Sequence, residues 1–210
     1  MHRKDTKKSG FPKNIYHPKA FNDWIKNNHE RLQDAMNRGA LPYWLKDNET
    51  YRDPQSNLRI NLFADKNELF DNIRTGRILA NNYPEKKITI RAHLEGEKNP
   101  EYDIDNVLAD AKRIESWNVA SSFNKAIKQE CKIVIIDLFK MQGRNLNANE
   151  LAKNIIRRFD DFKSEKIDEC YIVWDEKSMI VGRSQFNYYH DSKRFNYVIE
   201  LERKIRKGLL

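Results

Sequence analysis

Cysteine, glycine and long apolar stretches are all scarce in this sequence, and each scarcity excludes a class of protein. Two cysteines and seven glycines occur among 210 residues. Cys131 and Cys170 lie beside or within apolar runs, so we expect buried free thiols rather than a disulfide framework or a zinc site. No stretch of 18 apolar residues occurs, and the polar start "MHRKDTKKSGFPKN" has no apolar core for a signal peptide. We therefore expect a soluble protein made in the cytoplasm, without a membrane partner.

Several catalytic signatures are also missing. The sequence contains no Gly-rich phosphate loop, no Ser-His-Asp pattern, no setting for a nucleophilic cysteine and no internal repeat. What is abundant is positive charge, because 39 Lys and Arg residues against 31 Asp and Glu give a net charge of +8 and a pI near 9.3. Such a surface attracts polyanions such as nucleic acid, although an ordinary solubilising surface gives the same balance.

Apolar periodicity indicates an α/β domain behind a polar, basic lead. We expect residues 1–15 to be disordered, an amphipathic helix within 17–39 and an ordered loop at 41–57. The run "CKIVIIDLF" (131–139) is typical of a central strand that is covered on both faces. The other expected elements are a helix at 65–84, a strand at 86–95, a hairpin at 99–115, a helix at 117–130, a helix at 147–165, two strands within 168–186 and a basic amphipathic helix at 192–210. This order predicts a mixed β-sheet flanked by helices.

The segment "NPEYDIDNVLADAKRIE" (99–115) reads as two strands joined by a tight turn. Asp105 and Asn106 are residue types that adopt positive φ in a two-residue hairpin turn. Counting outward from this turn places Glu101 opposite Asp110. Side chains alternate between the faces, so one face carries Tyr102, Ile104, Val107, Ala109 and Ala111, and the other carries Glu101, Asp103, Leu108, Asp110 and Lys112. The hairpin is therefore expected to have an apolar back and a charged front.

The charged front predicts a metal site. Opposed carboxylates lie about 4.5 to 5.5 Å apart across a hairpin and destabilise it unless a cation lies between them. Because the ligands are oxygens, without His or Cys, the cation expected between Glu101 and Asp110 is Mg²⁺ or Mn²⁺. Lys112 on the same face could orient an attacking water or stabilise charge on a phosphate. A salt-bridged, solvent-facing hairpin remains the alternative, because an acidic residue followed two positions later by Lys recurs seven times elsewhere.

The same residues resemble a known nuclease signature. "PEYDIDNVLADAK" is similar to the PD-(D/E)xK motif of restriction-endonuclease-like nucleases, in the compact form that has both halves on one hairpin. The resemblance implies that Glu101 and Asp110 are metal ligands and that Lys112 is the catalytic lysine, with Glu101 in place of the usual aspartate. It also implies an acidic residue from the preceding helix, for which Glu68 is the first candidate and Asp71 the second.

The flanking sequence extends this resemblance to about residues 62–184. The segments "ASSFNKAIKQECKIVIIDL" and "ELAKNIIRRFDDFKSEKIDECYIVWDEKSMIVGR" are similar to the C-terminal toxin domains of contact-dependent growth inhibition systems. Residues 17–48 resemble phage Mu F-type head morphogenesis proteins. These resemblances imply an immunity protein or phage head proteins as partners, and a chain that is delivered or virion-associated. The implied division is a disordered lead and helical arm at 1–58, a restriction-endonuclease-like nuclease domain at 59–186 and a basic C-terminal helix at 187–210.

Further residues are candidates for binding the substrate. His93, at the end of the strand before the hairpin, could touch a phosphate, and Lys128 and Gln129 could contact the substrate from a helix end. The basic tail suits contacts with a nucleic-acid backbone, or equally a helix that docks on its own domain. Its four cations are Arg203, Lys204, Arg206 and Lys207. Two hypotheses follow: a metal-dependent nuclease that favours RNA (tRNA) over DNA, or a non-catalytic phage head-associated or nucleic-acid-binding protein on the same fold.

Overall fold

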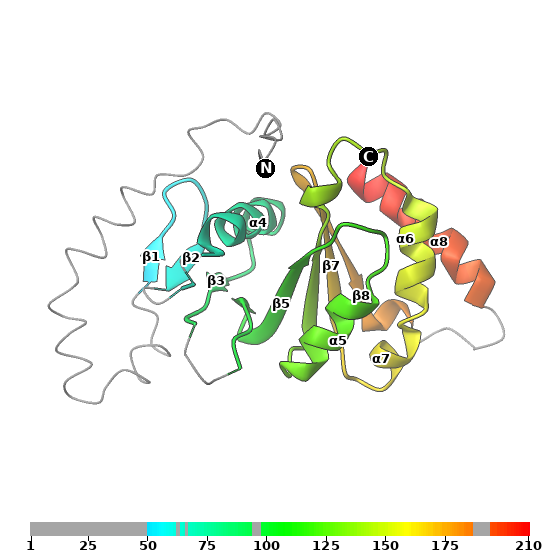
Figure 1. Cartoon of the computed structure of the whole chain (residues 1–210), viewed down its shortest axis with the longest axis horizontal. Coiled ribbons are helices and arrows are strands. Elements are labelled where there is room, and N and C mark those ends of the chain that lie inside the picture. Colours follow the sequence, from blue (N-terminus) through cyan, green and yellow to red (C-terminus); the bar gives the residue numbers. More distant parts are fainter. Residues whose placement is uncertain (1–49, 62–63, 66, 94–97, 187–193) are drawn as a thin grey trace, which may run out of the picture.

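The computed structural model describes residues 50–210 apart from 62–63, 66, 94–97 and 187–193. The expected disordered lead and the helix expected within 17–39 lie outside the described residues. Within the described part, the strands form one eight-stranded sheet with helices on both of its faces (Figure 1). The mixed α/β sheet flanked by helices that the sequence predicts is thereby confirmed.

Strands lie in the sheet in the order in which they occur along the chain. Three neighbouring pairs, β2–β3, β5–β6 and β6–β7, are parallel, and the other four pairs are antiparallel. The strands are β1 (Thr50–Arg52), β2 (Arg59–Asn61), β3 (Ile88–Ile90), β4 (Tyr102–Ile104), β5 (Val107–Arg113), β6 (Ile133–Asp137), β7 (Glu169–Trp174) and β8 (Lys177–Gly182).

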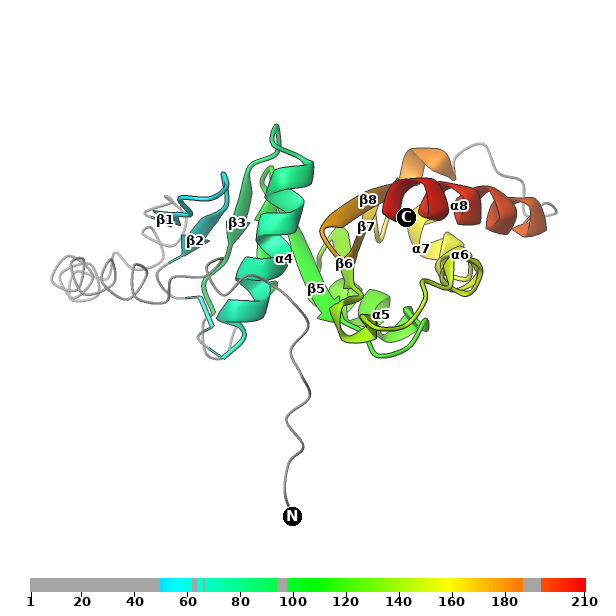
Figure 2. The same cartoon turned by 90° about the horizontal axis from the view of Figure 1, so that it is seen from above.

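The helices divide between the two faces of the sheet. They are α4 (Leu69–Asn82), α5 (Ala120–Lys128), α6 (Ala148–Ile156), α7 (Phe159–Lys163) and α8 (Arg194–Leu209). Seen from above, α4 lies between β1–β3 and β6–β8, and α6 and α8 lie beyond β6–β8 (Figure 2). Residues of α4 belong to one apolar core, and residues of α5, α6 and α8 belong to the other. Each face therefore has its own apolar core.

Strand β6 joins these two cores. All five of its residues are buried, as the apolar run predicts for a central strand. Ile133 and Ile135 pack with the α4 core, and Val134 and Ile136 pack with the core beneath α5, α6 and α8. The alternation follows from the two-residue period of a strand, which turns successive side chains to opposite faces.

Two buried ion pairs fix α4 on the sheet. Arg77 donates to both carboxylate oxygens of Asp53, at 2.7 and 2.6 Å. One turn earlier, Arg74 forms an ion pair with Asp137 at the end of β6, and Thr75 Oγ1 donates to the same carboxylate at 2.6 Å. A bidentate guanidinium and a second donor satisfy these carboxylates, which is the condition for burying charge without a large penalty.

The sheet and its packing extend beyond the range 59–186 expected for the nuclease domain. Residues 50–52, expected within a loop, form β1 and pair with β2. At the other end, α8 packs against α6 and β8 and contributes Leu201 and Ile205 to the core. Strands β1 and β2, which cover three residues each, were both missed.

The single helix expected at 147–165 is wrong, because the structure has two helices there. Asn147 caps α6 by accepting a hydrogen bond from the Glu150 backbone N–H at 3.1 Å. Arg158 then departs from helical geometry, at φ −96° and ψ 13°, and its guanidinium lies 2.5 Å from Asp161. The break turns Phe159 and Phe162 toward Phe186, with which both rings are in contact.

The strand expected at 86–95 is shorter than predicted, since β3 covers only Ile88–Ile90. Cys131 and Cys170 are free and buried, as expected. Burial raises the pKa of the Cys131 thiol to about 12, so this sulfur is not a ready nucleophile. None of the helices in the described part of the chain is long and apolar enough to cross a membrane.

Candidate active site

The β4–β5 hairpin has the register that the sequence predicts. Asp105 and Asn106 form the turn with φ values of 52° and 68°. Tyr102 pairs with Ala109, Asp103 with Leu108 and Ile104 with Val107. Positive φ at both central residues gives the tight two-residue turn, whose twist matches that of the flanking strands. This register brings Glu101 opposite Asp110.

Four side chains converge on the charged face of this hairpin. Lys112 Nζ lies 2.6 Å from Glu101 Oε1 and 3.0 Å from Asp110 Oδ1. From the end of α5, Gln129 Nε2 donates to the same Asp110 oxygen at 2.9 Å. The Ala111 backbone N–H holds the second Glu101 oxygen, Oε2, at 3.0 Å. The structure thus places the three residues of the predicted motif together and adds Gln129 to them.

This cluster lies deep in the molecule. The side chains of Asp110, Glu101 and Lys112 are 0%, 12% and 23% exposed. Asp110 points to the α5 face, since its partner on β6 is Val134 of the core on that side. The salt bridges of the alternative are present, but the side chains that make them are buried or partly buried rather than facing solvent.

Burial shifts the protonation of this cluster. Burial is the largest cause that raises the pKa of Glu101 to about 8, and hydrogen bonding and repulsion from Asp110 add to it. The Lys112 ammonium acts in the opposite direction. Burial lowers the pKa of Lys112, but Glu101 and Asp110 together outweigh this effect and raise it. A carboxyl group that is neutral over much of the physiological range, beside a buried carboxylate, indicates a site short of positive charge.

The donor set partly fits a divalent cation. Asp110 Oδ2 is buried and accepts no hydrogen bond from a nitrogen or hydroxyl donor of any described residue, and the one group that could donate to Asp110 besides Lys112 and Gln129 is the Glu101 carboxyl in its protonated form. Glu101 and Asp110 supply hard oxygen ligands of the kind that Mg²⁺ takes. Among the described residues, however, no group of three or more His, Cys, Asp or Glu side chains could hold a metal ion. The site offers two carboxylates and would need further oxygen ligands from water or substrate.

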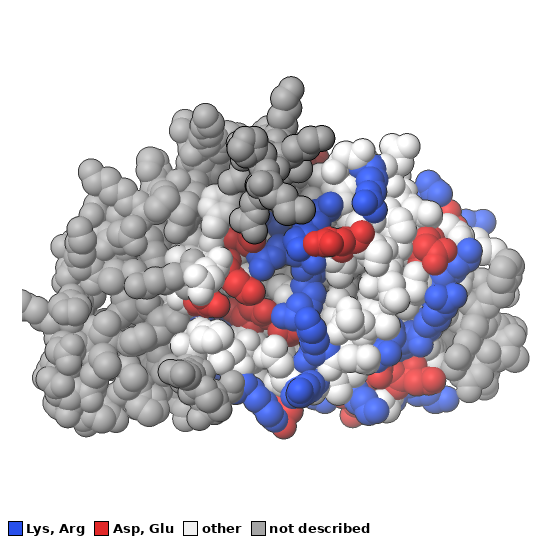
Figure 3. Space-filling view, viewed as in Figure 1, with Lys and Arg blue, Asp and Glu red and all other residues white. Residues whose placement is uncertain are grey.

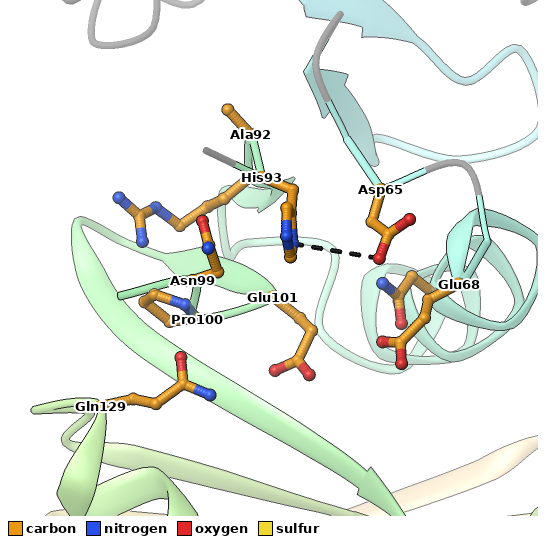
Figure 4. Close-up of a pocket in the computed structure, with 10 residues that line it drawn as sticks. Asp65, Glu68, Ala92, His93, Asn99, Pro100, Glu101 and Gln129 are labelled. Carbon is orange, nitrogen blue, oxygen red and sulfur yellow. Dashed lines mark ion pairs between the residues drawn. The ribbon is translucent and has the colours of Figure 1, made fainter. Parts of the chain in front are cut away.

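A cavity of about 210 Å³ opens beside Glu101 (Figure 4). It lies between the start of α4, the end of β3 and the end of α5. Its lining residues are Asp65, Glu68, Asn72, Arg91, Ala92, His93, Asn99, Pro100, Glu101 and Gln129. The carboxylates of Glu68 and Glu101 point toward the same space from opposite walls, and His93 lies 3.9 Å from Asp65.

The two acidic candidates on the helix side are both tied to β5. Glu68 is the residue before α4 and makes no capping hydrogen bond with its side chain. Arg113 holds Asp71 at 2.9 Å and Glu68 at 3.7 Å. Glu68 lines the cavity with Glu101, whereas Asp71 does not.

The remaining predicted residues are only partly brought to this site. His93 and Gln129 line the cavity, and Lys128 is exposed one residue before Gln129. The tail cations are exposed on α8, which packs against α6 and β8, whereas the cavity lies by α4 and β3 (Figure 1). These distant residues are Arg203, Lys204, Arg206 and Lys207.

Sequence reasoning missed part of the cavity wall. Asp65, Arg91 and Asn99 line the cavity without having been singled out. A signal was present for Arg91, because it follows the alternating strand "ITI" directly, where a strand end meets the hairpin. Its backbone N–H donates to the Glu101 carbonyl at 2.9 Å, which places it beside the predicted ligand.

Charge is unevenly distributed over the face seen in Figure 1. Acidic side chains gather between β3 and β5, and a column of Lys and Arg runs beside them over β5 and α5 (Figure 3).

Comparisons with known proteins find one weak structural similarity. No model of a protein family matches the sequence, and no curated protein matches it. One chain of a solved structure, described as "CdiA-CT/CdiI toxin and immunity complex from Burkholderia pseudomallei", is similar to this chain with a TM-score of 0.41 and 15% identity. The similarity covers 55% of this chain and 85% of that chain. At this level the likeness decides nothing about the site.

Proposed function

We propose that the protein is a metal-dependent nuclease that hydrolyses phosphodiester bonds of nucleic acid. The observation that carries the proposal is the convergence of Glu101, Asp110 and Lys112 on one recessed face, with Asp110 Oδ2 unsatisfied and the pKa of Glu101 raised to about 8. An ion pair that only stabilised the fold would need neither an unsatisfied oxygen on Asp110 nor a second carboxylate from Glu101. Together they suit the PD-(D/E)xK chemistry that the sequence resembles.

Glu101 and Asp110 would hold Mg²⁺ or Mn²⁺. When bound, such a cation offsets the repulsion of the two carboxylates and polarises a phosphoryl oxygen. Gln129 and Lys112 both bind Asp110 Oδ1, and this leaves Oδ2 available. Glu68, on the opposite wall of the cavity, is our candidate for a further contact to the metal or its water.

Lys112 supplies the protein's own acid–base chemistry. Its raised pKa keeps the ammonium charged at neutral pH, so it can orient a water or stabilise negative charge on the phosphate. Its two carboxylate partners fix the position of the nitrogen before substrate binds. Such preorganisation avoids the cost of reorienting the charge during the reaction.

We infer the substrate from the net positive charge of the protein, and its biological role from the sequence resemblance to toxin domains. A net charge of +8 favours a polyanion, and the similarity to growth-inhibition toxin domains leads us to favour RNA, tRNA in particular, over DNA. We therefore propose a toxin domain of phage or mobile-element origin, with an immunity protein as its partner. Phage head proteins remain a proposed partner on sequence resemblance alone, because residues 17–48 lie outside the described part.

The proposal is tested by cleavage assays on tRNA, single-stranded RNA and duplex DNA with Mg²⁺ or Mn²⁺. We expect Asp110→Asn and Lys112→Ala each to lose activity by about 10² to 10⁴-fold, the range for removal of a positioned catalytic group. Glu115→Gln is the matched control, since Glu115 follows the same strand but its side chain is 73% exposed. Chelation of the metal should also stop cleavage. If no substrate is cleaved by the wild type or by any variant, the non-catalytic hypothesis is supported instead. Equal cleavage by the wild type and all variants would show that Asp110 and Lys112 do not carry the activity.

A further inference from the structure

The cavity beside Glu101 has two chemically different walls. Toward α4 it is acidic, with Asp65 and Glu68. Toward β3 and α5 it carries Arg91, His93 and Gln129, which can donate to or accept from a ligand. A metal site needs only the acidic wall, so the second wall is available to the substrate itself.

The volume of the cavity restricts what can enter. About 210 Å³ is below the roughly 300–1,000 Å³ of cavities that hold drug-sized ligands. A base, or a phosphate with part of its sugar, is a group of suitable size, whereas a segment of double helix is far too large. The cavity therefore selects for a single unit of a chain that protrudes from its neighbours.

The depth of the reacting groups points the same way. Asp110 has no exposed side-chain surface and Glu101 is 12% exposed, so neither can meet a phosphate on the outside of a rigid duplex. A flexible single strand or loop can bring a phosphodiester into such a recess, whereas a stiff duplex holds its phosphates on a convex surface. Glu101 lines the cavity, so a substrate group that enters the cavity can reach it.

The second wall offers the contacts that an unpaired nucleotide would use. Arg91 forms no ion pair with any described residue, so its guanidinium is available to a phosphate. Gln129 Oε1 is buried and accepts no hydrogen bond from the described part of the chain, which leaves an acceptor for a base amino group. His93 is 52% exposed and has a ring face on which a base can stack.

We propose that this cavity binds one unpaired nucleotide of the substrate, with Arg91 on its phosphate and Gln129 and His93 at its base. The inference rests on the proposed nuclease function and adds the substrate class: the protein acts on single-stranded or looped nucleic acid and rejects continuous duplex. Arg91 is then a substrate-binding residue, while Glu101, Asp110 and Lys112 carry the chemistry.

The test uses three oligonucleotides of one sequence: a single strand, a continuous duplex and a duplex with one bulged nucleotide. Cleavage is measured with the full chain and Mg²⁺. Binding is measured by fluorescence anisotropy with the Lys112→Ala variant. We expect the single strand and the bulged duplex to bind and to be cut at least about tenfold better than the continuous duplex.

Arg91→Ala should weaken binding of the single strand by about tenfold, as expected for loss of one charge-assisted contact to phosphate. It should raise KM more than it lowers kcat, and Arg91→Lys should recover part of the loss. Arg157→Ala is the matched control, since Arg157 is an exposed arginine at the end of α6, far from the cavity (Figure 1). Thermal melting of each variant checks that it is folded.

Each outcome bears on one proposal or on both. Equal cleavage and binding of all three oligonucleotides, or no effect of Arg91→Ala, overturns the nucleotide pocket and leaves the nuclease standing. Selective binding of unpaired strands without any cleavage overturns the nuclease and supports the pocket. Neither binding nor cleavage overturns both.

Discussion

Two buried aspartates on neighbouring parallel strands have opposite surroundings. Asp110 on β5 and Asp137 on β6 are both 0% exposed, and they point to opposite faces of the sheet. Asp137 accepts from Arg74 and Thr75 through one oxygen and from the Phe139 backbone N–H, at 2.9 Å, through the other. Asp110 has partners on Oδ1 alone. Burial by itself therefore does not mark a functional carboxylate.

The difference lies in the balance of charge around each group. The Asp137 cluster holds one carboxylate and the guanidinium of Arg74, which also lies 3.8 Å from the centre of the Phe139 ring. The Asp110 cluster holds two carboxylates and one ammonium. The first is balanced as it stands, whereas the second is short of one positive charge whenever Glu101 is ionised, and below about pH 8 a proton on Glu101 makes up this shortage. This deficit indicates a site that binds a cation, and the predictions below test it.

The largest difference is expected between two matched substitutions, Asp137→Asn and Asp110→Asn. Asp137→Asn should lower the free energy of unfolding by about 3–5 kcal/mol, because it leaves the buried Arg74 without its counter-charge. Asp110→Asn should change it by less than about 1 kcal/mol, because Glu101, whose pKa falls when the Asp110 charge is removed, can ionise and remain the counter-charge of Lys112. Urea unfolding at pH 7 measures both values.

Equal losses for the two variants would contradict the distinction between a balanced and an unbalanced cluster. Activity provides the reverse check, since Asp110→Asn should abolish cleavage while any folded Asp137→Asn protein should retain it. Measuring cleavage below the unfolding transition of each variant separates the two effects.

A smaller, pH-dependent difference is expected from Glu101. Its pKa is raised from 4.5 to about 8, so the folded state binds a proton that the unfolded state releases between these values. The stability that this proton contributes is complete below pH 4.5 and is lost as the pH rises to about 8. We expect a loss on the order of 2–3 kcal/mol across this window without metal, and Glu101→Gln should not show it.

Urea midpoints between pH 5 and 8 measure this effect, with Glu115→Gln as the exposed control. Mg²⁺ should restore the stability of the wild type at pH 8, because the cation favours the ionised form of Glu101. If Glu101→Gln follows the same pH profile as the wild type, the deficit of positive charge is not centred on Glu101.

The site hairpin could be predicted because its signals are local. Turn chemistry at Asp105 and Asn106 and the two-residue period of a strand fix the register over a dozen residues. From these alone, Glu101, Asp110 and Lys112 fall on one face, as the structure confirms. The apolar run of β6 was equally direct evidence of a strand buried on both sides.

What could not be predicted depends on contacts between distant segments. Arg74 and Asp137 are 63 residues apart, and no local pattern links a helix arginine to a strand end. The burial of Asp110 likewise follows from α5 and Gln129, which pack over a face that the hairpin alone would leave open to solvent. No Gly or Pro lies at the break between α6 and α7, so the sequence carries no local signal for it. The break depends instead on the packing of Phe159 and Phe162 in the core.

The smallest difference is expected between Thr75→Val and Gln129→Ala, each of which removes one hydrogen bond to a buried aspartate. Thr75→Val should cost about 1 kcal/mol of stability and leave cleavage unchanged, because no water can replace the hydroxyl inside the α4 core. Gln129→Ala should cost less than about 0.5 kcal/mol, since water from the polar cavity can donate to Asp110 in its place. It should instead lower cleavage by about 10 to 100-fold, as loss of a group that orients a metal ligand does. If both variants lose stability and neither loses activity, Gln129 is as structural as Thr75, and the cluster around Asp110 differs from that of Asp137 only in its depth.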